Sequence, residues 1–412
     1  MFAQGQAAFL RFAPEEATVS TPDLERDGRR LEEGRHRGRS AISRVVATTP
    51  WALFAVLGAI AFLTASAGLR LPQASGHAYQ RLVTPAGFTD TLLYKEITAR
   101  VQTGEDYYRA ATSSQRAHHY PLRPAVAVRE PTEAWLLAVL GSDVGRRAAL
   151  FLLVIFTTET VRRALSTIGM GLPGRLYGVL AVGQSLVYAA LPDGPYVHEV
   201  WAGLLLTSSV AVWRPGRYGM SVALAFTACL FREIAAPALL AMIFCAAADR
   251  RWREVWAWGA AAAAFGLLAA AHLWLVSHQI LATDLASPGW TAVGGWPFIL
   301  ANARENLLLA LLPAPAASVA TSLALLGLAS ARGPWARRLA VVTFAFVALF
   351  WFVGRPDNAY WGNLYGPLLA LGLIWAPRAL RDLSRPGVLF KGWESATRGL
   401  PSIRRRILGR RP

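Results

Sequence analysis

Long apolar stretches, separated by short basic segments, run along most of the chain. A helix that crosses a bilayer needs about 20 apolar residues, and ten stretches approach that length. They are residues 51–70, 147–165, 174–191, 198–213, 219–231, 234–248, 255–276, 307–329, 339–353 and 362–376. The pattern predicts an all-α polytopic membrane protein with about ten transmembrane helices, whose membrane domain spans 51–376.

Arginines in the junctions between these stretches predict the topology. Basic residues favour the cytoplasmic side of a membrane. The relevant arginines are Arg44, Arg162, Arg163, Arg175, Arg214, Arg217, Arg250, Arg251, Arg253, Arg332, Arg337, Arg338, Arg378 and Arg381. If all of them are cytoplasmic, ten spans alternate without contradiction and both termini lie in the cytoplasm. We expect residues 1–50 to form a disordered cytoplasmic tail. We expect 377–412 to form a basic tail that contacts anionic lipids.

Residues 219–248 form an apolar segment interrupted by Arg232 and Glu233. Thirty residues are too few for two full-length spans, and basic residues flank both ends of the segment. We therefore predict two short helices that meet at Arg232-Glu233 and place this pair in the protein interior or a water-filled cavity. One alternative is an ion pair that only closes the turn. Another is one long tilted helix followed by a re-entrant turn.

The composition excludes most other classes of protein. The chain is 54% hydrophobic and 16% charged, whereas soluble domains carry about a quarter charged residues. The net charge of +17 is typical of some nucleic-acid-binding proteins, but here the arginines lie between apolar stretches, so we expect no nucleic-acid partner. Cys229 and Cys245 both lie inside apolar stretches, which leaves no disulfide framework and no cysteine metal site.

The longest connection between stretches is 72–146, on the predicted outer side. Its apolar spacing and turn residues predict three helices that lie on the membrane surface: 88–101, a second ending near Ala117, and 132–140 capped by Gly141. Prolines predict an extended stretch over 120–131. We expect Trp135 to be an interfacial anchor.

Most acidic residues beyond the N-terminal tail also lie on the predicted outer side, which suggests that binding or chemistry takes place there. Asp106 has two interpretations: a catalytic carboxylate, or part of a capping box with Thr103. His118 and His119 lack a metal-ligand partner at helical spacing, so a surface pair is expected. The remaining candidates for a site on this side are Glu105, Tyr107, Tyr108, Arg123, Arg129, Glu130, His198, Glu199, Arg232, Glu233, Arg355, Asp357 and Tyr360. Glu199 and Tyr360 also have purely structural interpretations. Glu199 could cap a helix, and Tyr360 could be an aromatic-belt residue.

Several segments resemble the GT-C superfamily of integral-membrane glycosyltransferases, which use polyprenyl-phosphate sugars as donors. The resemblance covers the layout of 51–376. Its motifs are Gly104-Glu105-Asp106-Tyr107-Tyr108, Tyr120-Pro-Leu-Arg123-Pro, Arg129-Glu130-Pro131-Thr132, His198-Glu199-Val-Trp201-Ala-Gly203 and Phe231-Arg232-Glu233. The chain departs from larger members because it lacks their soluble C-terminal domain. It also lacks the Asp-x-Asp motif of metal-dependent oligosaccharyltransferases.

The resemblance implies a bacterial inner-membrane enzyme whose active site faces the periplasm. It would transfer a sugar from a polyprenyl-phosphate donor to a glycan, lipid or protein acceptor, without a metal or other cofactor. Asp106, or Glu105, would be the general base, and Glu199 with His198 would supply a second acid or an acceptor ligand. Arg232, Arg123, Arg129 and Arg355 are candidates for binding the departing phosphate. Inversion at the anomeric carbon would follow from a single displacement.

Two other classes of function compete with this hypothesis. A lipid or solute transporter of the cell envelope would place charges within broken helices of two corresponding halves. The chain shows no internal repeat, and apart from Arg232-Glu233 its charges lie at the ends of spans. A non-enzymatic scaffold of an envelope complex would not need acids and arginines concentrated on one side.

Overall fold

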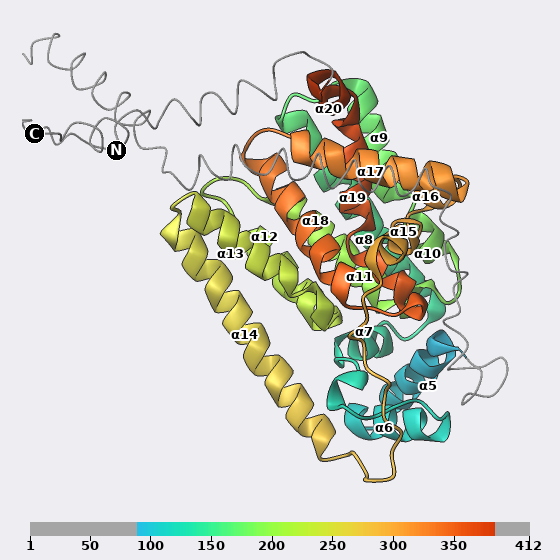
Figure 1. Ribbon diagram of the computed structural model, residues 1–412. Helices are drawn as coiled ribbons and strands as arrows, with labels where there is room; N and C mark the ends of the chain where they lie inside the picture. The colour runs from blue at the N-terminus through green and yellow to red at the C-terminus, as the bar shows by residue number, and fades with distance from the viewer. Residues whose placement is uncertain (1–88, 384–412) are drawn as a thin grey trace, which may run out of the picture. The chain divides into compact units, whose positions relative to one another are not determined.

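The computed structural model describes residues 89–383, and this part of the chain is all-helical (Figure 1). Within it, β-structure is limited to isolated bridges such as Thr291 with Val353. The fold class predicted from the apolar pattern is therefore confirmed as all-α. The predicted first span, 51–70, the tail 1–50 and most of the basic tail 377–412 lie outside the described residues.

The loop before the second predicted span contains three α-helices, as predicted. They are α5 (Asp90–Gln102), α6 (Tyr107–Ala117) and α7 (Thr132–Leu140), with a short 3₁₀ helix, η1 (Ala125–Ala127), in the stretch that we expected to be extended. The bounds of α7 and its Gly141 cap are confirmed.

The predicted capping box at Thr103 and Asp106 is wrong. Thr103 ends α5, and Gly104, with a φ of 92°, then turns the chain. Asp106 is itself the N-cap of α6, and its carboxylate accepts a hydrogen bond from the Arg109 N–H at 3.0 Å. The spacing suggested a cap correctly but placed it one turn too early.

Ten α-helices, α8 to α17, follow in the chain. Their bounds are α8 (Asp143–Thr167), α9 (Leu172–Gly183), α10 (Leu186–Ala190), α11 (His198–Val212), α12 (Gly219–Phe231), α13 (Pro237–Ala248), α14 (Trp252–Ser277), α15 (Gly295–Ala303), α16 (Leu307–Ala310) and α17 (Ala314–Ser330), with 3₁₀ helices η2 (Gly194–Tyr196) and η3 (Glu233–Ala235) between them. The last elements are α18 (Pro334–Phe352), η4 (Pro356–Leu364), α19 (Gly366–Leu371), η5 (Gly372–Ile374) and α20 (Ala376–Leu383).

Three predicted spans are interrupted in the structure. The stretch 174–191 divides into α9 and α10, and 307–329 divides into α16 and α17 around Pro313. The stretch 362–376 covers the end of η4, then α19 and η5. Prolines stand near the start of several of these pieces. Proline fits the first turn of a helix, but within a helix it lacks the backbone N–H and clashes with the preceding turn. An apolar pattern indicates which residues avoid water, but it does not show where a helix is interrupted.

Among residues 89–383, two helices are long and apolar enough to cross a membrane, α14 and α18. Only 17% of the most apolar window of α14 is buried inside the protein, against 50% for α18. Shorter apolar helices cover 219–231, 233–248 and 314–330.

The segment 219–248 forms the predicted pair of short helices, α12 and α13. Near the start of α12, Ser221 exchanges hydrogen bonds with Ser209 of α11. Just after α13, Asp249 pairs with Arg337 and Arg338 of α18. The Arg232-Glu233 break therefore forms the tip of a helical hairpin whose two ends lie together.

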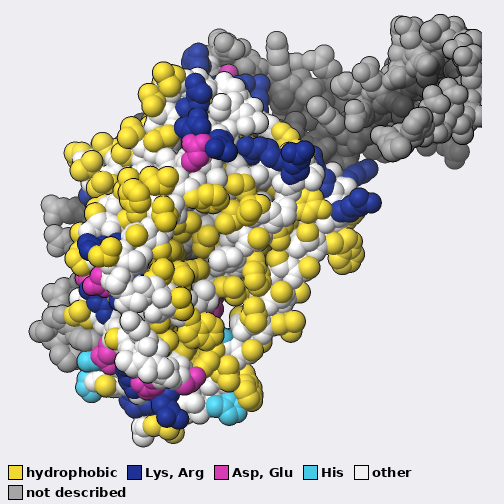
Figure 2. All heavy atoms as spheres, turned by 180° about the vertical axis from the view of Figure 1, so that it is seen from behind, with side chains coloured by type: hydrophobic (Ala, Val, Ile, Leu, Met, Phe, Trp, Pro, Cys, Tyr) yellow, Lys and Arg dark blue, Asp and Glu magenta, His cyan; other side chains and the backbone are white. Residues whose placement is uncertain are grey.

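The connections between helices gather at two ends. At the inner end, named after the predicted orientation, Arg214 contacts Thr167 and Arg332 pairs with Asp382. At the outer end, which carries α5, α6 and α7, Arg116 pairs with Asp284 at 2.6 Å. Figure 2 shows hydrophobic side chains over the middle of one face, Lys and Arg at its upper, inner end, and Asp, Glu and His among basic residues at its lower end. Every junction in 89–383 that we predicted to be cytoplasmic lies at the inner end.

Close backbone contacts hold η4 in the interior. An added Cβ at Gly203 of α11 would lie 2.0 Å from the Asn363 carbonyl oxygen, and one at Gly362 would lie 2.0 Å from that of Asn302 in α15. Only glycine allows η4 to pack this tightly between α11 and α15. This packing fixes Trp361 beside the hairpin tip.

Candidate functional site

Arg232 lies at the tip of the α12–α13 hairpin and is fully buried. Its backbone is extended (φ −154°), because α12 ends at Phe231 and α13 begins at Pro237. Its guanidinium forms ion pairs with Glu199 of α11 and with Glu233. It also lies 5.9 Å from the centre of the Trp361 ring. Arg232 therefore joins three elements, and the alternative that its pair with Glu233 only closes a turn is wrong.

The outer loop supplies a second guanidinium to the same place. Arg129 Nη1 lies 3.7 Å from Glu233 Oε1. The Tyr107 hydroxyl donates a hydrogen bond to the Arg129 carbonyl oxygen at 2.6 Å, which fixes the backbone of this segment. The carboxyl groups of Glu130 and Glu233 lie close enough to interact electrostatically. Burial, reinforced by the negative charge of Glu233, raises the pKa of Glu130.

A histidine and a further carboxyl group lie behind this pair. His198 Nδ1 is 3.3 Å from Glu133 Oε1, and the Tyr94 ring packs edge-on against the imidazole, with the ring centres 4.5 Å apart. Glu133 is 1% exposed. Burial, reinforced by the Glu199 charge, raises its pKa well above the usual carboxyl range. These contacts attach α5 and α7 of the outer loop to the start of α11.

Asp90, the first residue of α5, borders the same site. Burial, together with the negative charge of Asp90, raises the pKa of Tyr120. Asp90 is also close enough to Tyr94 and Tyr360 to act electrostatically on both. It is partly exposed, whereas Glu133 and Glu199 are buried.

We name this group of charged residues the outer site. Its members are Asp90, Arg129, Glu130, Glu133, His198, Glu199, Arg232 and Glu233. Within residues 89–383, four of its buried atoms have no hydrogen-bond partner: Arg232 Nη2 and one carboxyl oxygen each of Glu130, Glu133 and Glu233. Buried polar groups are normally satisfied, and exceptions are found where a water or ligand completes the site.

Eight of the residues chosen from the sequence meet at this site or border it. His198, Glu199, Arg129, Glu130, Arg232 and Glu233 meet directly, and Tyr107 supports Arg129. Tyr360 lies within electrostatic reach of Arg129, Glu199, Asp90 and Arg232. Glu199 lies in the first turn of α11, as expected for a helix cap, but its carboxylate binds Arg232 instead of the helix terminus.

The other sequence candidates have partners elsewhere. Glu105 forms a two-bond ion pair with Arg100, and Asp106 caps α6. Arg355 pairs with Asp357 at 2.8 Å. Arg123 is exposed, and its backbone N–H donates to the Leu285 carbonyl oxygen. Tyr108 packs beside His272, with the ring centres 5.6 Å apart.

Two residues of the outer site were missed by the analysis of the sequence. Asp90 opens a surface helix, and Glu133 stands in the first turn of another, so each resembles an ordinary acid near a helix N-terminus. The only local signal for Glu133 is its spacing of three residues from Glu130. Tyr120, which Asp90 influences electrostatically, and His198, which pairs with Glu133, are distant in sequence, and only the fold brings them together.

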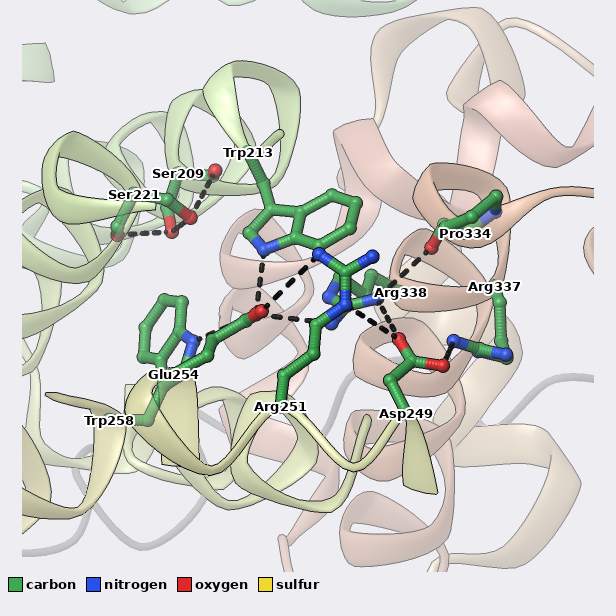
Figure 3. A network of polar contacts seen from close by, with 10 residues as sticks. All are labelled: Ser209, Trp213, Ser221, Asp249, Arg251, Glu254, Trp258, Pro334, Arg337 and Arg338. Atoms are coloured by element: carbon green, nitrogen blue, oxygen red, sulfur yellow. Dashed lines mark hydrogen bonds and ion pairs between the residues drawn. The ribbon is translucent and has the colours of Figure 1, made fainter. Parts of the chain in front are cut away.

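A second buried ionic cluster, which we name the inner network, lies at the opposite end (Figure 3). Arg338 of α18 is fully buried, and its terminal nitrogens bind Asp249 and Glu254 at 3.0 Å each. Its guanidinium carbon lies 3.5 Å from the centre of the Trp213 ring. Trp213 in turn donates its indole N–H to Glu254 at 2.8 Å. The inner network joins the end of α11, the start of α14 and the start of α18.

Comparisons with protein-family models, curated proteins and solved structures find no match to this chain. Within 89–383, no three His, Cys, Asp or Glu side chains form a group that could hold a metal ion.

Proposed function

We propose that the chain is a multi-pass membrane glycosyltransferase of the GT-C type. It transfers a sugar from a polyprenyl-phosphate donor to an envelope glycan, lipid or protein at the outer face of a bacterial inner membrane. The observation that carries the proposal is the outer site. There, two guanidinium groups and several carboxyl groups meet where the α12–α13 hairpin touches the outer loop.

The surface of α14 supports a location in the membrane. Trp252, Trp256, Leu267 and Trp274 lie on one face of the helix and are 61–77% exposed. Trp274 follows Trp252 by 22 residues, or about 33 Å at 1.5 Å per residue. The hydrocarbon core of a bilayer is about 30 Å thick, and tryptophan is enriched at both of its interfaces. In water, such a continuous apolar face would be unusual for a monomer.

The two guanidinium groups suit the departing phosphate. When the bond from the anomeric carbon to phosphate breaks, the leaving polyprenyl phosphate gains a negative charge. Arg232 Nη2 lacks a partner among the described residues, and Arg129 retains 14% exposure of its side chain. Positive groups held in place before the reaction stabilise such a charge as it develops. We assign phosphate binding to Arg232 and Arg129, and not to Arg123 or Arg355.

The acceptor hydroxyl must lose a proton as its oxygen bonds to the anomeric carbon. We assign this general-base role to Asp90, because it is partly exposed and lies close enough to the tyrosines at the edge of the outer site to act on them electrostatically. The earlier candidates Asp106 and Glu105 have other partners, the α6 N-terminus and Arg100. Glu199 and His198 keep their proposed role in holding the acceptor side of the site. A single displacement would invert the anomeric configuration, and no step requires a metal.

Transport is the second candidate. The specific observation in its favour is a charged break between two short helices, α12 and α13, because transporters place binding sites at such breaks. A transporter would move its substrate without making a glycosidic bond. Measuring whether a glycosylated product forms therefore distinguishes the two proposals.

The test compares three variants with a deletion strain of the native host: Asp90→Asn, Arg232→Gln and Asp106→Asn. Immunoblots measure protein level, and mass spectrometry of envelope glycans measures the product. We expect Asp90→Asn and Arg232→Gln to lack the same sugar as the deletion strain. Asp106→Asn is the matched control, because asparagine caps a helix about as well as aspartate, and its glycans should be unchanged.

Two outcomes would overturn parts of the proposal. If Asp106→Asn loses the sugar at normal protein level while Asp90→Asn keeps it, the base is Asp106. If the deletion leaves every glycan unchanged, glycosyl transfer is wrong, and uptake or lipid-translocation assays become the relevant measurement. An NMR assignment of a retained anomeric configuration in the product would refute the single displacement.

A further inference from the structure

Exposed arginines and tryptophans gather at the corner between α13 and α14, at the inner end. Arg250 and Arg253 are exposed, and Arg251 is about one third exposed. Trp252 is 61% and Trp256 77% exposed. Such large indole surfaces beside charged groups are unusual in water but typical of residues at a membrane interface.

The acids near this corner are already engaged. Asp249 pairs with Arg337 and Arg338, and the Glu254 Oε1 atom accepts from Trp213, Trp258 and Arg338 within the inner network (Figure 3). Arg251 reaches these two acids only at 3.9 Å. The two acids therefore pair mainly with arginines of the inner network, and the exposed arginines of the corner keep a net positive charge.

The direction of α14 adds to this positive potential. Arg251 is the N-cap residue of α14, no side chain caps the helix, and Arg253 lies in its first turn. The N-terminus of a helix carries a partial positive charge, so cations there are unfavourable and anions favourable. Glu254 also lies in this turn, but its contacts point it into the protein. The corner thus combines several uncompensated charges of one sign.

We propose that the corner of Arg250, Arg251, Trp252, Arg253 and Trp256 binds the phosphate headgroup of an anionic phospholipid. The apolar face of α14 continues directly from Trp256 to Leu267, so acyl chains would run beside it while the headgroup meets the arginines. This continuity favours a lipid over a free phosphate ion. The lipid would be a bound partner of the fold and takes no part in glycosyl transfer.

The experiment measures lipid binding to the full chain by native mass spectrometry. Purified protein is exchanged into micelles with equal amounts of phosphatidylglycerol and phosphatidylcholine, and the ratio of the two bound lipids is recorded. Each basic residue near an anionic surface contributes about 1 kcal/mol, or about fivefold in binding. We expect Arg250→Gln/Arg253→Gln to lower the preference for phosphatidylglycerol by about 10-fold or more.

A matched control removes two positive charges from the C-terminal tail, as Arg405→Gln/Arg406→Gln. It should keep most of the preference. If the tail variant loses as much as the corner variant, net charge alone attracts the lipid and the proposed site is wrong. The proposal also fails if the corner variant binds like the unmodified chain, or if glycerol 3-phosphate, which lacks acyl chains, displaces the lipid. Arg250 and Arg253 lie on the surface, and circular dichroism of the variant checks that it is folded.

Discussion

The outer site and the inner network are built from the same chemistry but differ in what they leave unsatisfied. Each has a fully buried arginine paired with two acids, Arg232 at one end and Arg338 at the other. Both terminal nitrogens of Arg338 have partners, whereas Arg232 Nη2 has none in the described part of the chain. Among the same residues, the inner network also leaves buried atoms without a hydrogen-bond partner, but these are Arg338 Nε, Arg337 Nε and one oxygen of Glu254. Side chains are partly exposed in both clusters, for example 14% for Arg129 at the outer site and 16% for Asp249 in the inner network. A buried ion pair alone therefore does not mark a functional site, and the feature that separates the clusters is the unpaired terminal nitrogen of Arg232.

The two clusters also differ in the elements that build them. Helix ends supply the inner network, so its contacts fix how α11, α14 and α18 pack. The outer site joins the outer loop to the break between α12 and α13. We therefore expect changes in the inner network to act on stability, and changes in the outer site to act on activity.

The largest effect is expected for Arg338→Gln. Removing one partner of a buried ion pair costs about 3–5 kcal/mol, because the remaining charge stays buried without compensation. Glu254 would be left in this state, so the free energy of unfolding in mixed micelles should fall by that amount. Adding Glu254→Gln should recover part of the loss. An unchanged unfolding curve for the single variant would contradict the structural role of the inner network.

Asp90→Asn should act on the reaction and leave the fold intact. General-base catalysis contributes about 100- to 10,000-fold to a rate, so product formation by purified enzyme should fall at least 100-fold. Asparagine has nearly the same shape as aspartate, so the unfolding midpoint should stay near that of the unmodified chain. A large loss of stability, with normal turnover of the remaining folded enzyme, would assign Asp90 a structural role.

Glu130→Gln should change how stability depends on pH. Burial holds the pKa of Glu130 above its unfolded value, so the folded state keeps a proton that the unfolded state releases. Stability of the unmodified chain should therefore fall as pH rises from the ordinary carboxyl pKa towards the raised one, by about 1.4 kcal/mol per pH unit. The variant lacks this dependence. Denaturation curves at pH 5 and pH 8 measure it, and equal slopes for both proteins would show that Glu130 is ionised.

The smallest effect is expected for Asp106→Ala. Loss of an N-cap side chain costs about 1 kcal/mol, and Asp106 caps α6 through the Arg109 N–H. Unfolding should shift by this amount, while Asp106→Asn should show almost no shift. Loss of activity in Asp106→Asn at unchanged stability would return Asp106 to the list of catalytic residues.

The strongest local signals in the sequence predicted the matching parts of the fold. The charged break in an apolar segment predicted the hairpin tip at Arg232-Glu233, and Thr132 to Gly141 predicted α7 with its cap. Periodicity and helix punctuation depend on neighbouring residues, which is why they can be read from sequence. The breaks within 174–191 and 307–329 were missed, because their apolar pattern continues through them.

The candidate site was only partly predictable for the same reason. Charge on the outer side selected His198, Glu199, Arg129 and Arg232, since ionisable groups near spans are rare and costly. The pairing of Glu133 with His198 and the electrostatic influence of Asp90 on Tyr120 join segments distant in the sequence. No local pattern distinguishes such acids from those that favour a helix N-terminus.

The central claim is that the outer site performs chemistry while the inner network maintains structure. The most direct test is sugar transfer per folded molecule, measured with purified Arg232→Gln and Arg338→Gln, and a polyprenyl-phosphate sugar donor. We predict that Arg232→Gln loses about 100- to 1,000-fold in turnover, whereas folded Arg338→Gln turns over like the unmodified enzyme. Equal loss in both variants, or full turnover by Arg232→Gln, would contradict the claim.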